Sequence, residues 1–143
     1  MDNIVKKGDG GKNLIDKELE EIRRRKLREL LERRNYPDVP VHINEGNFDE
    51  FVREYPIVII DCYADWCAPC KIVEPIIEES AKNFSGKIVF GKLNVDENRG
   101  IAMRFNIMSI PTLLIFKDGR LIKRVIGALP KDRLISVFNE LIT

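Results

Sequence analysis

Three cysteines fall within nine positions of the sequence, in the stretch DCYADWCAPCK at residues 61–71. The full set, Cys62-x4-Cys67-x2-Cys70, has the spacing of the first three ligands of a plant-type iron–sulfur cluster. The pair Cys67-x2-Cys70 alone, next to alternating strand and helix patterns, is typical of a dithiol that cycles between reduced and disulfide forms. The three cysteines together with His42, the one histidine of the chain, also have the ligand count of a zinc site.

The sequence argues against both the iron–sulfur cluster and the zinc site, for different reasons. An iron–sulfur cluster of this kind needs a fourth cysteine, and the chain contains only three. Asp61 and Cys62 end an apolar run that predicts a strand, and successive strand residues point to opposite faces. We therefore expect Cys62 to face away from Cys67 and Cys70 and to be a small buried apolar residue. We expect His42 to be a surface residue of a short strand.

The region around the cysteines alternates between strand and helix patterns. Ile57–Cys62 is apolar and β-branched, which is typical of a strand buried on both faces of a sheet. The Asp118-Gly119 pair between two further apolar runs predicts a hairpin. The order β-α-β-α-β-α-β-β-α predicts an α/β domain with a mixed sheet and helices on both faces. The expected strands are 41–43, 57–62, 88–94, 112–116 and 121–126, and the expected helices are 48–54, 67–83, 98–105 and 131–142.

The first forty residues have a different composition. Residues 1–13 combine glycine with charge and predict a mobile tail, whereas residues 12–34 are rich in Leu, Glu, Arg and Lys and predict a charged helix. Its two apolar stripes lie about 100° apart, which disfavours a coiled-coil dimer, so we expect a monomer. Prolines at 37 and 40 end the helix. We expect an extension at 1–40, made of tail, helix and Pro-containing linker, and one domain at 41–143.

Charge and hydropathy restrict the function classes. The net charge of +1 gives no global field for nucleic acid or an anionic membrane, so we expect neither as a partner. The N-terminal residues have no signal-peptide pattern, and no apolar run is longer than four residues, as at 57–60, so the expected location is the cytoplasm. An odd number of cysteines in a reducing compartment argues against a structural disulfide framework.

Three segments in order carry a specific resemblance to a known family. They are VIIDCYADWCAPCK, KLNVDENRGIAMRFNIMSIPTLLIFKDG and RVIGALPKDRL, and they extend from the first buried strand to the last helix. From Val41 to its end the chain closely resembles the thioredoxin family, for which the CxxC dithiol is a well-known mark. The resemblance implies the thioredoxin fold and the reduction of protein disulfides.

Disulfide exchange explains the cysteine spacing. Cys67 is expected where a strand gives way to a helix, exposed, with free N–H groups and the helix dipole to stabilise its thiolate as the nucleophile. Cys70 lies one turn on and is the expected resolving thiol. Pro69 stiffens the loop. Ala68 stands where the commonest thioredoxins have glycine, which leaves the reduction potential open.

The resemblance implies roles for further residues. Asp61 matches the buried carboxylate that moves protons for Cys70, and burial should raise its pKa toward neutrality; the alternative is a simple cap of the turn. Lys92 matches the lysine near that carboxylate. Ile110-Pro111 matches a cis-proline loop, where the Ile110 backbone can pair with an extended substrate. The expected contact surface around the sulfurs consists of Trp66, Pro69, Met108, Ile110, Pro111, Gly127 and Ala128.

The resulting hypothesis is a cytoplasmic thiol–disulfide oxidoreductase. It needs no cofactor beyond the redox-active Cys67–Cys70 disulfide, and its implied partners are protein disulfide substrates and a thioredoxin reductase that uses NADPH or reduced ferredoxin. A disulfide isomerase or oxidant is a second hypothesis, separable by the redox potential. A redox-inert binding module is a third, disfavoured because a pure scaffold needs neither the cysteine pair nor Asp61.

Overall fold

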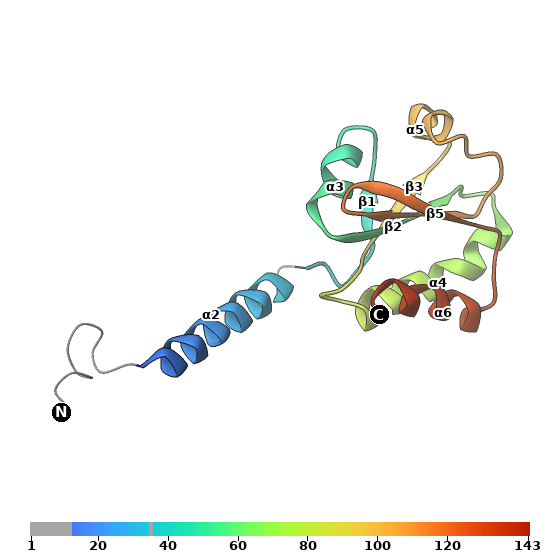
Figure 1. Ribbon diagram of the computed structural model, residues 1–143. Helices are drawn as coiled ribbons and strands as arrows, with labels where there is room; N and C mark the ends of the chain where they lie inside the picture. Colours follow the sequence, from blue (N-terminus) through green and yellow to red (C-terminus); the bar gives the residue numbers. More distant parts are fainter. Residues whose placement is uncertain (1–12, 35) are drawn as a thin grey trace, which may run out of the picture. The chain divides into compact units, whose positions relative to one another are not determined.

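The computed structural model describes residues 13–34 and 36–143, and the chain divides into two compact units, residues 1–35 and 36–143 (Figure 1). The tail predicted for residues 1–13 lies, apart from Asn13, outside the described residues. The domain boundary expected at residue 40 stays a prediction about independent folding.

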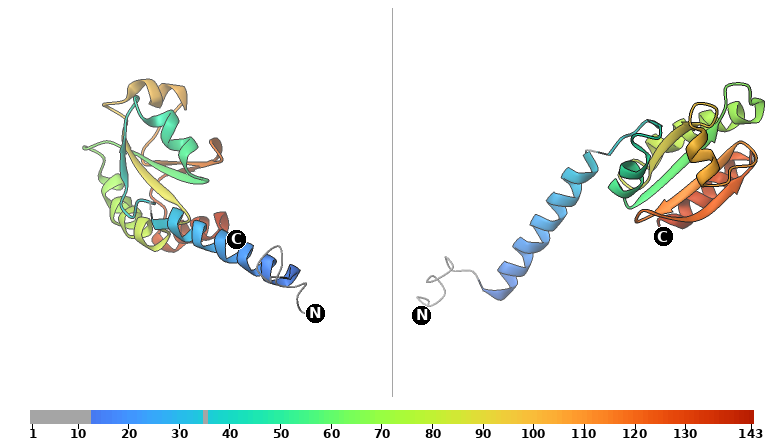
Figure 2. Two further views of the ribbon diagram at one scale, coloured as in Figure 1. Left: turned by 90° about the vertical axis from the view of Figure 1, so that its left-hand side faces the viewer. Right: turned by 90° about the horizontal axis from the view of Figure 1, so that it is seen from above.

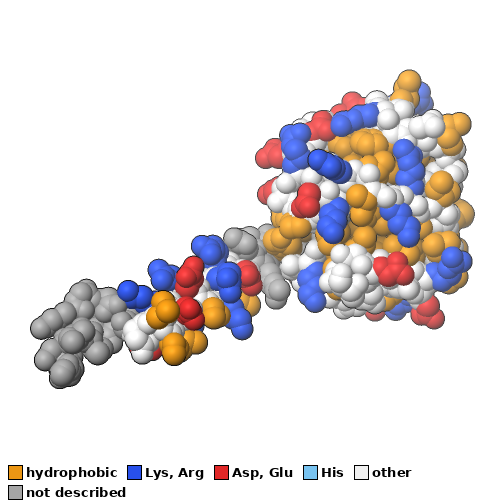
Figure 3. Space-filling model, viewed as in Figure 1, with side chains coloured by type: hydrophobic (Ala, Val, Ile, Leu, Met, Phe, Trp, Pro, Cys, Tyr) orange, Lys and Arg blue, Asp and Glu red, His pale blue; other side chains and the backbone are white. Residues whose placement is uncertain are grey.

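The described residues of the first unit form the helix α2 (Leu14–Arg34). A reciprocal cap explains where it begins: the Asn13 side chain accepts a hydrogen bond from the Asp16 N–H at 2.8 Å, and the Asp16 carboxylate accepts one from the Asn13 N–H at 3.4 Å. Acidic, basic and apolar side chains are interspersed along the helix (Figure 3). The predicted charged helix is therefore present.

The second unit has nine elements in the predicted order. They are β1 (Val41–Ile43), α3 (Phe48–Glu54), β2 (Ile57–Tyr63), α4 (Ala68–Asn83), β3 (Val89–Asn94), α5 (Arg99–Arg104), β4 (Thr112–Lys117), β5 (Arg120–Ile126) and α6 (Lys131–Leu141). The hairpin between β4 and β5 turns at Asp118 and Gly119, with φ of 51° and 82°. Both values are positive, as the predicted Asp-Gly hairpin turn requires.

The five strands form one mixed sheet in the order β1-β3-β2-β4-β5. The pairs β1–β3 and β3–β2 are parallel, and β2–β4 and β4–β5 are antiparallel. β2 is the central strand, with Ile57, Val58, Ile59 and Ile60 all buried, which is why this run is apolar throughout.

Two apolar layers cover the two faces of the sheet. On one side Phe48 and Phe51 of α3 pack against Val58 and Ile60 of β2. On the other side α4 and α6 cover residues such as Ile59 and Phe90, with Phe138 of α6 fully buried. Figures 1 and 2 show α4 and α6 together on one side of the sheet and α3 and α5 on the other. The predicted α/β architecture, with a mixed sheet between helical layers, is confirmed.

Candidate active site

The Cys67–Cys70 pair forms a disulfide at the point where the chain leaves β2 and enters α4, with the two Cα atoms 5.3 Å apart. Cys67 is the N-cap residue of α4, and Pro69 lies in the first turn, where a helix needs no N–H from it. The Cys70 backbone N–H donates to the Cys67 Sγ at 3.2 Å. The N-terminal end of α4, which carries a partial positive charge, therefore lies at the Cys67 Sγ.

Exposure of Cys67 differs from expectation. We expected an exposed nucleophile, but in this disulfide form Cys67 and Cys70 are each only 3% exposed. Both sulfurs pack with buried Ala64, and the partly buried Tyr63 and Ile110 lie against this small cluster. The expectation was wrong because neighbouring side chains pack against the disulfide and leave little of either cysteine exposed.

Cys62 is separated from this pair by the sheet. Its register partner on β3 is Leu93, and both belong to the apolar layer under α3. Burial raises the pKa of the Cys62 thiol above its usual value. Since Cys62 points away from the disulfide, the zinc arrangement with His42 lacks the required geometry, and His42 is exposed on β1 as expected. In the described part of the chain no group of three or more His, Cys, Asp or Glu side chains is placed to hold a metal ion.

Asp61 lies within β2, which continues for two residues beyond it. It is 1% exposed, and its Oδ1 atom is buried without a hydrogen-bond partner. Desolvation raises the pKa of its carboxyl from 3.8 to about 7, with Lys92 acting in the lowering direction and Glu74 in the raising direction. A group with a pKa near neutrality can both accept and return a proton at physiological pH.

Lys92 is the register partner of Asp61 on the adjacent strand β3. Its Nζ atom is 3.4 Å from Oε2 of Glu74, and it lies 5.0 Å from the centroid of the Tyr63 ring. The structure therefore brings the predicted Asp61 and Lys92 together and adds Glu74, which the sequence did not indicate. No short-range signal pointed to Glu74, because the pair joins α4 to β3.

The loop before β4 faces the same end of the sheet. The Ile110–Pro111 peptide bond is cis, as the resemblance implied. The Gly127 N–H donates to the Pro111 carbonyl oxygen at 2.9 Å, and the Thr112 hydroxyl donates to the Ser109 carbonyl oxygen at 2.6 Å. Gly127, with a φ of 92°, is thereby held beside the cis-proline loop.

A groove of about 320 Å³ lies next to the disulfide. Trp66 and Met108, which are 71% and 85% exposed, form part of its wall. The indole Nε1 of Trp66 donates to Asp96 Oδ2 at 2.8 Å, which fixes the ring over the groove. Sequence reasoning missed Asp96, since a partner thirty positions away leaves no local pattern. The groove is lined by Trp66, Val95, Asp96, Arg99, Ala102, Ile107, Met108, Ser109 and Ile110.

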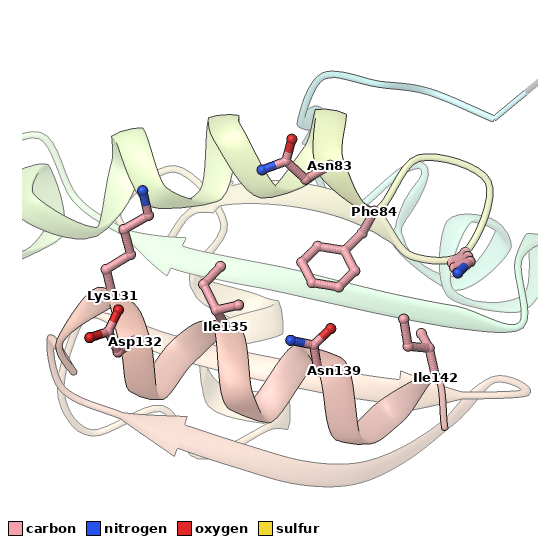
Figure 4. Close-up of a pocket in the computed structure, with 8 residues that line it drawn as sticks. Asn83, Phe84, Lys131, Asp132, Ile135, Asn139 and Ile142 are labelled. Atoms are coloured by element: carbon pink, nitrogen blue, oxygen red, sulfur yellow. The ribbon is translucent and has the colours of Figure 1, made fainter.

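A second groove, of about 560 Å³, lies between the C-terminal part of α4 and α6 (Figure 4). It contains none of the predicted site residues, since the disulfide is at the opposite end of α4. Despite its size, this groove is therefore not part of the candidate active site. It is lined by Asn83, Phe84, Lys87, Lys131, Asp132, Ile135, Asn139 and Ile142.

Comparison with known proteins identifies the family. The Thioredoxin family model matches residues 39–140. The chain belongs to the thioredoxin family. It is 42% identical over 100 residues to thioredoxin from Staphylococcus haemolyticus, covering 70% of this chain and 95% of that relative. It is 50% identical over 93 residues to the chloroplastic thioredoxin M-type of Spinacia oleracea, covering 64% of this chain and 51% of that relative.

A solved thioredoxin has the same fold. A mutant thioredoxin from Halobacterium salinarum NRC-1 superposes with a TM-score of 0.71 at 30% identity, covering 76% of this chain and 95% of that one. The chain spans nearly all of the bacterial relative and about half of the spinach one. With the Cys67–Cys70 disulfide in place, the protein is a thiol–disulfide oxidoreductase that uses its own redox-active disulfide. None of the helices in the described residues is long and apolar enough to cross a membrane.

Proposed function

We propose that this thioredoxin reduces protein disulfides, with Cys67 as the attacking thiolate and Cys70 as the resolving thiol. The observation that carries the assignment is the hydrogen bond from the Cys70 N–H to the Cys67 Sγ at the N-terminus of α4. That donor and the helix dipole stabilise negative charge on Cys67 and none on Cys70. Cys70 therefore stays protonated until a base removes its proton.

The proposed cycle balances two electrons and two protons. The Cys67 thiolate attacks one sulfur of the substrate disulfide, and the first substrate sulfur leaves as a thiolate. Asp61, as carboxylate, takes the proton of Cys70 through water, and the Cys70 thiolate attacks the Cys67 Sγ. The bond from Cys67 to substrate breaks, the Cys67–Cys70 bond forms, and the second substrate sulfur leaves. The two leaving thiolates take up the proton from Asp61 and one from solvent.

The substrate is proposed to lie over the disulfide and along the groove beside it. Exposed Trp66 and Met108 supply apolar contact area on one side, and the groove beside them accommodates a side chain. The Ile110 backbone, which precedes the cis-proline, is proposed to pair with an extended segment of the substrate, and Pro69 and Gly127 are proposed to form the rim of the contact surface. Lys92 is proposed to tune the proton affinity of Asp61.

Each turnover leaves Cys67–Cys70 oxidised, so a donor must return two electrons. We assign that role to a thioredoxin reductase linked to NADPH or ferredoxin, acting at the same surface. The cytoplasm is the proposed location, because a reducing compartment keeps a thiol such as Cys62 free and returns the Cys67–Cys70 pair to its reduced form. The protein is proposed to work as a monomer.

Trapping of the mixed disulfide tests the cysteine roles. The Cys70→Ser variant, mixed with insulin or another disulfide protein, is expected to accumulate a covalent adduct through Cys67, detected by non-reducing electrophoresis and mass spectrometry. Cys67→Ser is expected to form no adduct. Cys62→Ser is the matched control and should keep full insulin reduction, because Cys62 lies across the sheet. Adducts through Cys70 in the Cys67→Ser variant at the rate of Cys70→Ser would reverse the assignment.

A further inference from the structure

Glu74 lies four residues after Cys70 on α4, and therefore on the same face of the helix, one turn further from the disulfide. Its Oε2 atom is 3.4 Å from Lys92 Nζ, and the Glu74 side chain is 43% exposed whereas that of Lys92 is 16% exposed. The pair thus lies at the border between the protein interior and solvent. Neither the cycle above nor the cysteine motif uses Glu74.

Asp61 and Lys92 both point to the side of the sheet that α4 covers. Ile59 and Phe90 are register partners in the apolar layer beneath α4, and Asp61 and Lys92 follow each of them by two residues. Residues two apart on a strand share a face. Because neighbouring strands lie about 4.8 Å apart, a lysine at this register is close enough to lower the pKa of the buried carboxyl.

The Lys92 ammonium is nevertheless engaged elsewhere. It bonds to Glu74 and lies over the Tyr63 ring, while Oδ1 of Asp61 stays buried with no hydrogen-bond partner. A direct bond from Lys92 would satisfy that oxygen and favour its charged form. Glu74 thus competes with Asp61 for the same cation. The charged groups that act on Asp61 are Lys92 on β3 and Glu74 on α4. Tyr63, two residues further along β2, shares its face, whereas Cys62 lies on the opposite face of the sheet. The register partner of Asp61 on β4 is apolar Leu113.

We propose that Glu74 is a positioning residue for proton transfer: by holding the Lys92 ammonium, it keeps Lys92 from bonding to the buried Asp61 carboxyl. The inference rests on the proposed role of Asp61 as the proton carrier for Cys70. Its consequence is kinetic. A carboxyl that titrates near the working pH exchanges protons with Cys70 in both directions, whereas one ionised far below it is a weak base.

Titration of Asp61 by nuclear magnetic resonance tests the control by Glu74 directly. The pH titration uses the oxidised protein, because Cys67 and Cys70 do not ionise in the disulfide. The aspartate carboxyl carbons are labelled with ¹³C, and the Asp61 resonance is identified as the one that Asp61→Asn removes. Glu74→Gln removes one charge from a half-exposed site, and the midpoint is expected to fall by about 0.5 to 1 pH unit. Glu78→Gln, the same change one turn further along α4, is the matched control and should leave the midpoint in place. An unchanged midpoint in Glu74→Gln overturns the proposal.

The double variant separates action through Lys92 from the direct field of Glu74. Lys92→Gln alone is expected to raise the midpoint, because it removes the cation that favours ionised Asp61. In that background, Glu74→Gln should shift the midpoint by less than half of its effect in the natural protein. An equal shift in both backgrounds means that Glu74 acts by its own charge, and the positioning role is then wrong.

Kinetics distinguish failure of this inference from failure of the role of Asp61. The resolution step is followed by stopped flow as release of substrate thiol from a preformed mixed disulfide, between pH 5 and 9. The pH profile of Glu74→Gln is expected to move down by the same interval as its resonance midpoint. If the resonance moves and the profile does not, the proposed link to proton transfer is wrong. If Asp61→Asn keeps the natural profile, the role of Asp61 itself fails, whatever the resonance of Glu74→Gln shows.

Discussion

Replacing Asp61 by asparagine should stabilise the domain, and only above mildly acidic pH. In the native protein burial raises the pKa of this carboxyl from 3.8 to about 7, whereas in the unfolded chain it returns to its usual value. Between those two pH values the native state binds a proton that the unfolded state has lost. The free energy of unfolding therefore falls as the pH rises through this interval.

The size of the stabilisation follows from the difference between the native and unfolded pKa values of Asp61. The two pKa values differ by about 3, and each pH unit corresponds to about 1.4 kcal/mol, so ionised Asp61 costs about 4 kcal/mol at pH 8. Asparagine has nearly the same shape and no charge, so Asp61→Asn avoids this cost. With a guanidinium dependence of about 4 kcal/mol per molar, the unfolding midpoint should rise by about 1 M at pH 8. At pH 4, where native Asp61 is neutral, the two proteins should differ little.

Guanidinium unfolding of the oxidised proteins, followed by circular dichroism at pH 4, 6 and 8, provides the assay. The control is Asp65→Asn, which makes the same change at an exposed position near the disulfide. Its midpoint relative to the natural protein should not depend on pH. A stability difference for Asp61→Asn that is constant from pH 4 to 8 would refute the conclusion that the carboxyl is buried with a raised pKa.

Three further predictions concern the scaffold. Phe138→Ala removes a fully buried ring that packs edge-to-face on Phe84 and Phe90, at centroid distances of 5.9 and 5.3 Å. The free energy of unfolding should fall by about 3 to 5 kcal/mol. A loss below about 1 kcal/mol would contradict this packing. Gly91→Ala places a Cβ at 2.7 Å from Ile43 Cγ1, which should cost about 1 to 3 kcal/mol in the same unfolding assay, and an unchanged midpoint would contradict the close approach. Deletion of residues 1–38, checked by circular dichroism and insulin reduction, should leave fold and activity intact; lost activity in a folded domain would show that the extension takes part in catalysis.

Local patterns predicted the elements of the domain well. The apolar run ending at Asp61, the Asp118–Gly119 turn and the cysteine spacing each depend on a few neighbouring residues, and their outcomes agree with the structure. Alternation along a strand also predicts correctly that Cys62 lies on the face opposite the disulfide. These features are set by backbone geometry, which the sequence encodes over short distances.

Features that depend on packing between distant segments escaped the sequence. The Trp66–Asp96 hydrogen bond and the Glu74–Lys92 ion pair each join residues that are far apart in the chain, and no repeating pattern in the sequence links them. The burial of Cys67 was also missed, because the covering groups, Tyr63 and Ile110 among them, come from different parts of the chain. Such contacts are fixed by tertiary packing, and one sequence alone does not specify which side chains meet.

A redox titration of the Cys67–Cys70 couple tests the central claim most directly. The protein is equilibrated with glutathione or dithiothreitol buffers of known potential, and free thiols are counted by alkylation and mass spectrometry, with Cys62→Ser to remove the third thiol. The account predicts one two-electron couple with a potential at or below that of the cytosolic glutathione pool. A markedly oxidising couple would indicate an oxidant or isomerase and turn attention to Ala68, and the absence of any couple would contradict the assignment of this site altogether.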